Sequence, residues 1–110
     1  MAIAKGYAVD KAIDILRENK IQNALINAGG DLKPIRQRSD QLNWRVELQN
    51  PRSSESLLAS FSISGNSVAT SGDYQKYFKL NAKRYHILDP KTVYPATSGS
   101  MSVTVITKNV

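Results

Sequence analysis

The spacing of apolar residues along the chain predicts a helix near its start. From Ala4 to about Asn19, apolar residues return every three or four positions, and charged residues fall between them. This spacing puts the apolar side chains on one face of a helix. The predicted face consists of Ala8, Ala12, Ile15 and Leu16, widened by Val9 and Ile13.

Beyond this helix, short apolar segments separated by turn-forming residues predict strands. The first, Asn23–Ala28, has the pattern of a largely buried strand that ends at a Gly-Gly-Asp turn. Pro34–Asn43 is predicted to be a loop, and Gly65-Asn66 the turn of a hairpin. Tyr74–Leu80 fits either a strand or one to two turns of helix. The remaining predicted strands are Trp44–Leu48, Leu58–Ser64, Ser67–Thr70, Tyr85–Leu88 and Ser102–Thr107.

One helix followed by about six short strands, mostly in hairpin order, predicts an α+β domain in which the helix packs on a mostly antiparallel sheet. The 110 residues show no internal repeat, low-complexity run or linker, so we expect residues 1–110 to form a single domain or part of one. A hydrophobic fraction of 41% is sufficient for a core. No apolar run approaches the roughly 18 residues that a membrane-spanning helix needs.

Composition narrows the chemistry that the chain can perform. It has no cysteine and a single histidine, His86, which excludes disulfides, cysteine nucleophiles and zinc sites with several imidazole ligands. The net charge of +6 favours anionic ligands such as phosphates, acidic partners or nucleic acid. The basic residues are scattered, however, as on an ordinary solvated surface.

Four polar, turn-forming clusters lie at predicted ends of helices and strands. Free backbone N–H groups at such ends can meet an anionic ligand, and glycine lets the backbone approach a phosphate. Each cluster alone also fits a purely structural role, as a turn with positive φ, a capped turn or a packed histidine. The clusters are Ala2–Gly6, Asn27–Asp31, Thr70–Tyr74 and His86–Thr92.

In this order, the clusters resemble the successive motifs of the ApbE family. The resemblance covers nearly the whole chain, and five ordered motifs are far more specific than any one of them. The motifs are A-I-A-K-G-Y-A-V-D at Ala2–Asp10, N-A-G-G-D at Asn27–Asp31, A-T-S-G-D-Y at Ala69–Tyr74, Y-H-I-L-D-P-K-T at Tyr85–Thr92 and S-V-T-V at Ser102–Val105.

The resemblance implies the flavin-binding core of an FAD:protein FMN transferase. Such enzymes use Mg²⁺ and transfer the FMN half of FAD to a Thr or Ser hydroxyl of a target flavoprotein, with AMP leaving. By resemblance, the backbone carbonyl of Ala2 coordinates the metal, while Lys5, His86 and Ile87 contact FAD. His86 is also the candidate base for the acceptor hydroxyl, a usual role of neutral imidazole near neutral pH.

Further flavin contacts are expected from the segment after Ala69. Its hydroxyl, carboxylate and backbone groups could contact the dinucleotide, and Asp31 could help to order the site. The candidates in this segment are Thr70, Ser71, Gly72 and Asp73. Mg²⁺ and a lysine would neutralise the charge that develops when a pyrophosphate linkage breaks.

The chain departs from the family pattern at three places. Met1 stands where the family has an Asp-Leu-Gly-like segment, and the Ala-Asp segment that carries the Asp and Thr metal ligands would lie beyond Val110. We therefore expect a fragment of a longer chain, or a short paralogue, with an incomplete metal site and no full activity alone. Third, Val93 replaces a family glycine, and a positive φ there would strain this β-branched residue.

Two other functions stay open. One is a non-catalytic flavin- or nucleotide-binding module. The other is a basic nucleic-acid binder, which would need Tyr74, Tyr77 and Tyr85 on one face to stack on bases. We rank this last and expect a target flavoprotein, not nucleic acid, as the partner.

The resemblance and the predicted sheet also bear on location and assembly. Family members commonly act in the periplasm as inner-membrane lipoproteins. This chain shows no signal-peptide pattern, so a cytoplasmic location is the alternative. Exposed sheet edges predict that the isolated chain self-associates, which makes a homo-oligomer possible.

Overall fold

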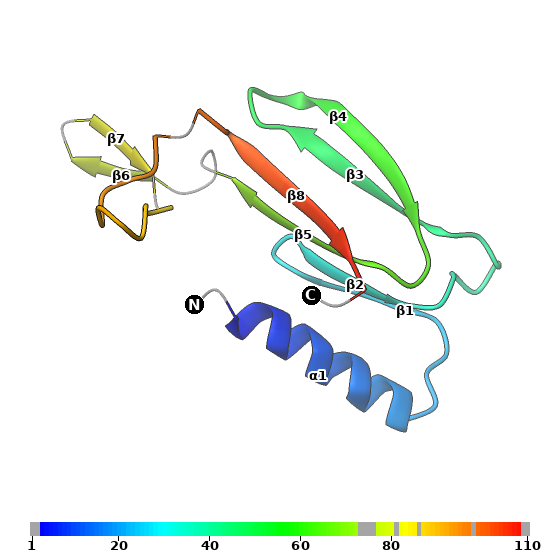
Figure 1. Cartoon of the computed structure of the whole chain (residues 1–110). Helices are drawn as coiled ribbons and strands as arrows, with labels where there is room; N and C mark the ends of the chain where they lie inside the picture. Colours follow the sequence, from blue (N-terminus) through cyan, green and yellow to red (C-terminus); the bar gives the residue numbers. More distant parts are fainter. Residues whose placement is uncertain (1–2, 73–76, 81, 86, 98, 109–110) are drawn as a thin grey trace.

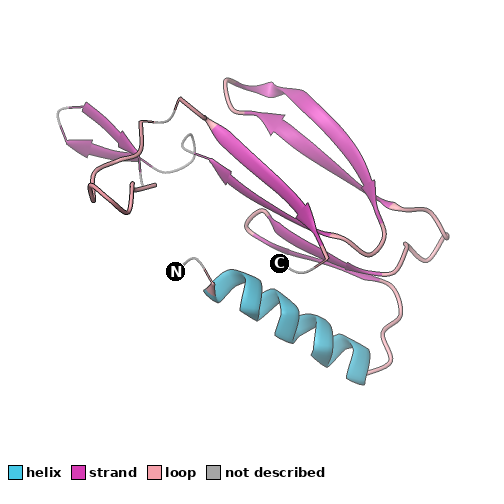
Figure 2. Cartoon of the chain, in the orientation of Figure 1, coloured by secondary structure: helices cyan, strands magenta, loops and turns pink. Residues whose placement is uncertain are grey.

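A computed structural model describes residues 3–72, 77–80, 82–85, 87–97 and 99–108. Figure 1 shows the arrangement of the elements, and Figure 2 distinguishes helix from strand. Among the described residues, these are α1 (Ala4–Glu18), β1 (Ala24–Ala28), β2 (Asp31–Ile35), β3 (Trp44–Asn50), β4 (Ser53–Ile63), β5 (Ser67–Gly72), β6 (Tyr77–Leu80), β7 (Ala82–Tyr85) and β8 (Ser102–Thr107). The predicted α+β class with antiparallel pairing is confirmed, and the strands form three sheets of four, two and two strands.

Helix α1 ends in a Schellman motif. The amide of Ile21 donates to the carbonyl of Leu16 at 2.9 Å, and the amide of Lys20 donates to the carbonyl of Arg17 at 2.9 Å. This pattern satisfies carbonyls of the last turn and places the residue after the cap in the left-handed region. Lys20 takes that position with φ of 61°.

The buried face of α1 differs from the predicted one. Gly6, Val9 and Ile13 are buried, whereas Ala8 and Ile15 are exposed. The prediction that Ala8 and Ile15 belong to the core face was therefore wrong. Both rows have helical spacing, so periodicity alone cannot choose between them. Ion pairs from α1 to β2, described below, accompany the orientation that buries the first row.

Strands β1, β2, β5 and β8 form the largest sheet, in this order, and α1 packs on β1 and β2 (Figure 1). As an edge strand, β1 is only half-buried, so the expectation of a largely buried strand was wrong. Strand β2 lies where the sequence indicated a loop beginning at Pro34. Pro34 pairs with Leu25 of β1, whereas the pairing between β2 and β5 is confined to Leu32 and Val68. Proline has no N–H to donate, and it is accommodated because the β5 side of the strand is unpaired at this position.

A hairpin of β3 and β4 lies beside this sheet and supplies much of the core. Val46 and Ile63 of the hairpin are buried together with Val68 of β5. The predicted hairpin at Gly65-Asn66 is wrong, because β4 pairs with β3 and β5 pairs with β2 and β8. Gly65 does not have the positive φ that a tight two-residue hairpin turn requires.

Among the described residues between β5 and β8, the helices and strands are limited to β6 and β7. Strands β6 and β7 pair with each other, which resolves the ambiguity at Tyr74–Leu80 in favour of a strand over Tyr77–Leu80. The strand predicted over Tyr85–Leu88 is wrong: β7 ends at Tyr85, and Leu88 makes only an isolated bridge to Pro95. In the described part of the chain, no helix has the length and apolar character needed to cross a membrane.

Candidate functional site

A Gly-Gly turn between β1 and β2 forms the centre of the candidate site. Gly29 and Gly30 have φ of 60° and 95°, a conformation in which two consecutive residues with side chains would be strained. The Asn27 side chain stabilises the turn, because its Oδ1 accepts a hydrogen bond from the amide of Gly30 at 3.1 Å. The sequence motif at Asn27–Asp31 is thus a tight turn stabilised by its own asparagine, with open space where a Cβ of Gly29 would lie.

Lys5 reaches this turn from the first turn of α1. Its Nζ donates to the carbonyl of Gly29 at 3.2 Å and lies 3.3 Å from Oδ2 of Asp31. The Asp31 side chain is 12% exposed, whereas the Lys5 side chain is 50% exposed. An ammonium group carries three N–H donors, so these two contacts leave one donor of Lys5 for a ligand. Asp31 therefore holds Lys5 at the turn while leaving it accessible.

A cleft of about 370 Å³ lies on the other side of the turn, between the four-stranded sheet and the β3–β4 hairpin. Its volume is in the range of small-molecule sites, and its walls are polar and apolar in similar measure. The apolar residues of the lining are Leu32, Val46, Leu48, Phe61 and Val68, and the other lining residues are Asn27, Gly29, Gly30, Glu47, Gln49, Thr70, Gly72 and Thr104.

Strand β5 contributes alternate residues to the cleft. Thr70 and Gly72 line it, and Thr70 Oγ1 lies 2.9 Å from Thr104 Oγ1 of β8. Ser71 is exposed and, because successive strand residues point to opposite faces, lies on the other face of the sheet. The structure therefore brings Thr70 and Gly72, but not Ser71, together with the Gly-Gly turn.

The segment around Asp89 forms a compact turn that is separate from the cleft lining. The amide of Val93 donates to the carbonyl of Asp89 at 2.8 Å, and the Asp89 side chain accepts from the amide of Lys91 at 2.8 Å. Val93 has φ of 61°, the left-handed conformation expected where the family has glycine. Ile87 is 38% exposed and does not line the cleft.

Comparisons with known proteins identify the family. The ApbE family model matches residues 1–110. The chain belongs to the ApbE family. It is 42% identical over 107 residues to a Klebsiella pneumoniae protein named FAD:protein FMN transferase, covering 96% of this chain and 32% of that protein. An Escherichia coli K12 protein of the same name is 35% identical over 106 residues, covering 94% of this chain and 30% of that protein.

Solved ApbE structures share the fold. The Thermotoga maritima ApbE protein matches with a TM-score of 0.90 at 36% identity, over 97% of this chain and 35% of that one. The apo form of the Pseudomonas stutzeri flavinyl transferase ApbE matches with a TM-score of 0.78 at 36% identity, over 97% and 33% of the two chains. The chain thus spans about a third of the length of these ApbE proteins.

Three of the predicted ApbE site residues, Ala2, Asp73 and His86, lie outside the described residues. Within the described ranges, no group of three or more His, Cys, Asp or Glu side chains lies close enough to hold a metal ion.

Sequence reasoning missed the contributions of Asn27, Thr104 and Lys33. Asn27 and Thr104 belong to two of the ApbE-like motifs. The motifs do not predict that Asn27 accepts a hydrogen bond from the Gly30 amide or that Thr104 contacts the Thr70 hydroxyl. Lys33 Nζ pairs with Asp10 Oδ1 at 2.6 Å, and its side chain is 11% exposed. Its location in a strand was hidden because Pro34 indicated a loop.

Proposed function

We propose that this chain is the flavin-binding part of an FAD:protein FMN transferase, as its ApbE relatives are named. FAD is the substrate, and the FMN half is transferred to a Thr or Ser hydroxyl of a target flavoprotein. The observation that carries this proposal is the half-exposed Lys5 ammonium held by Gly29 and Asp31 beside a ligand-sized cleft.

Lys5 is proposed to bind the pyrophosphate of FAD. A charge-assisted hydrogen bond from an ammonium to a phosphate oxygen is stronger than a neutral one. The glycine carbonyl and the Asp31 carboxylate restrict where the ammonium can lie, so less side-chain freedom is lost when the ligand binds. The turn at Gly29-Gly30 has no Cβ atoms, which lets a phosphate or ribose approach its backbone.

The cleft is proposed to take an uncharged part of the dinucleotide. The partly buried Leu32 and Phe61 offer apolar surface to a flat ring, while the paired hydroxyls of Thr70 and Thr104 offer donors and acceptors to its edge. This division puts the charged centre of FAD at Lys5 and a ring in the cleft, with the Gly-Gly turn between them.

In the proposed reaction, the acceptor hydroxyl oxygen attacks the phosphorus of the FMN half. A new phosphoester bond forms, the P–O bond to AMP breaks, and AMP leaves with the bonding electron pair. The hydroxyl proton passes to a base, for which His86 is the candidate. Lys5 offsets negative charge on the phosphate oxygens. Magnesium is proposed as the metal of the transferase by resemblance to the family, and when bound it would offset negative charge on the transferring phosphate.

A non-catalytic flavin- or nucleotide-binding module is the second candidate. It rests on the same contacts of Lys5 and the same cleft. It differs from the first candidate only in the transfer step. For the transferase we also propose a periplasmic location, with the cytoplasm as the alternative.

Covalent flavin transfer tests the proposal. A family-length protein containing this segment is incubated with FAD, Mg²⁺ and a target flavoprotein domain, and in-gel flavin fluorescence and intact mass report covalent FMN. His86→Ala is expected to abolish transfer while leaving FAD affinity largely unchanged. Transfer at the wild-type rate in this variant would exclude His86 as the base, and FAD binding without any transfer by the wild type would favour the binding module.

A further inference from the structure

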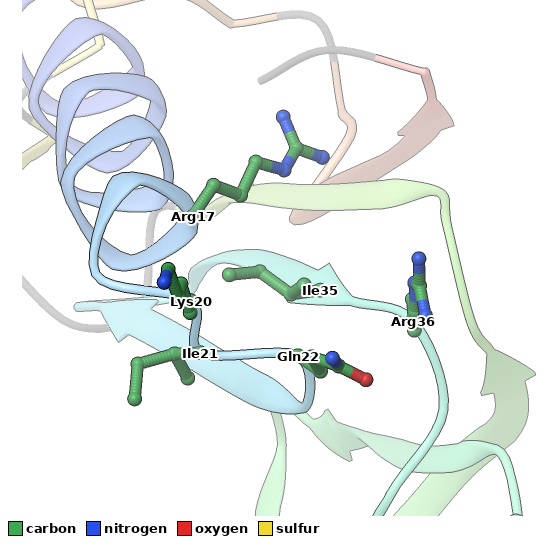
Figure 3. Close-up of a pocket in the computed structure, with 6 residues that line it drawn as sticks. All are labelled: Arg17, Lys20, Ile21, Gln22, Ile35 and Arg36. Atoms are coloured by element: carbon green, nitrogen blue, oxygen red, sulfur yellow. The ribbon is translucent and has the colours of Figure 1, made fainter.

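A second pocket lies at the opposite end of α1 from Lys5, where the helix turns into β1 (Figure 3). It has a volume of about 490 Å³. Its lining consists of Arg17, Lys20, Ile21, Gln22, Ile35 and Arg36. In Figure 3, Arg17 and Arg36 extend on either side of Ile35, which is 4% exposed and forms an apolar floor.

The charges of this pocket are unbalanced. Three of its six lining residues are cationic, and none is acidic. Lys20 and Arg36 form no ion pair with the described residues. Arg17 forms a long one: its Nη1 lies 3.9 Å from Oδ1 of Asp14, and both side chains are more than half exposed. Such a pair contributes little to stability. All three cations are exposed, and a bound anion would pair with groups that have no acidic partner in the pocket lining.

Helix capping does not account for these cations. Lysine and arginine are common near helix C-termini because they can bond the last carbonyls. Here, however, the carbonyls of Ile15, Leu16 and Arg17 already accept backbone amides from residues 19–21. Arg36 does not belong to the helix at all and comes from the end of β2.

We propose that this pocket binds a phosphate group carried by a small molecule. Two guanidinium groups can each direct paired N–H donors at a tetrahedral oxyanion, and an ammonium adds a mobile third cation. Ile21, which lines the pocket and is 42% exposed, offers apolar surface to the organic part of a phosphate monoester. The site is distinct from the flavin site, because Arg17 follows Lys5 by twelve residues, or about 18 Å along a helix.

The backbone allows a test that separates binding from folding. Lys20 and Arg36 have φ of 61° and 51°, in the region that glycine adopts without strain. The double variant Lys20→Gly/Arg36→Gly therefore removes two cations and relieves backbone strain. Gln41→Gly is the matched control, since Gln41 has φ of 64° but does not line the pocket.

The chain labelled with ¹⁵N is titrated with sodium phosphate and with glycerol phosphate, each compared with sodium chloride at equal ionic strength. We expect saturable amide shifts confined to residues 17–22 and 35–37. In the double variant the affinity for phosphate should fall by about tenfold or more, while the variant melts no lower than wild type and Gln41→Gly binds as wild type does. Shifts that chloride reproduces, or an unchanged affinity in the double variant, would overturn the proposal.

Discussion

At the scale of single residues, backbone angles explain several sequence positions better than side-chain contacts do. Val93 is 73% exposed, so its side chain gains little from packing. It nevertheless occupies a left-handed position that closes the turn from Asp89. The resemblance to the family pattern, with glycine at this position, already suggested strain at Val93. The φ of 61° in the structure agrees with this expectation.

Val93→Gly should stabilise the turn by about 1 kcal/mol. A left-handed residue with a side chain costs about 1–2 kcal/mol, and glycine relieves this strain. Part of the gain in stability is lost because glycine has more conformational freedom in the unfolded chain. Hydrogen exchange of the Val93 amide, which donates to Asp89, is the measurement. Val93→Ala, which keeps a Cβ atom, serves as the control and should gain less. Faster exchange in Val93→Gly would contradict the strain interpretation.

At the scale of elements, the helix and most strands could be predicted from periodicity, whereas the face of the helix and the strand partners could not. The bounds of α1 agree with the prediction to one residue. Its buried row depends on contacts with β2 that are distant in sequence, such as the pair of Lys33 with Asp10. Strand β2 was missed because Pro34 is unfavourable inside a sheet unless one side of the strand is unpaired.

Two isoleucines of α1 were both assigned to the apolar face, and the structure buries only one of them. Ile13 is 0% exposed and Ile15 is 57% exposed. Ile13→Ala should lower the free energy of unfolding by about 2–5 kcal/mol, as for other buried isoleucines. Ile15→Ala should change it by less than about 0.5 kcal/mol. Urea unfolding followed by circular dichroism measures both, and equal losses for the two variants would contradict the orientation of α1.

At the scale of the whole molecule, the four-stranded sheet ends in an open, uncharged edge. Within the described residues, strand β8 pairs only with β5, and its six residues are Ser, Val, Thr, Val, Ile and Thr. Val103 and Val105 are both more than half exposed. Edge strands of soluble proteins usually carry a charge, a proline or a bulge that prevents pairing with another chain. Sequence reasoning anticipated exposed edges but could not say which strand would form one.

The isolated chain is therefore predicted to self-associate through β8, and Val105→Lys should reduce this association by placing a charge on the edge. Light scattering coupled to size exclusion, over a range of protein concentrations, gives the mass. Lys108→Ala, just beyond the strand, is a control that should not reduce association. A wild-type chain that stays monomeric at all concentrations would refute the prediction.

The candidate site also belongs to this scale, because its parts come from distant segments. The motifs were enough to select Lys5, Asn27–Asp31 and Thr70 as site residues. Only the fold shows that Lys5 contacts Gly29 and Asp31, and that Thr70 lines the cleft beside the turn. The apolar lining from Val46 and Phe61 carries no motif and could not be recognised before the hairpin was placed.

FAD binding is the most direct test of the central claim, that Lys5 at the Gly-Gly turn holds the flavin dinucleotide. The chain is titrated into FAD, and flavin fluorescence anisotropy is followed for wild type, Lys5→Gln and Lys11→Gln. Lys11 lies on the same helix with its ammonium 5.6 Å from the Tyr7 ring centroid, away from the turn. A hydrogen bond between charged groups contributes about 1.5–3 kcal/mol, so Lys5→Gln should weaken binding by about tenfold or more, while Lys11→Gln binds as wild type does. Equal affinities for wild type and Lys5→Gln would contradict the claim.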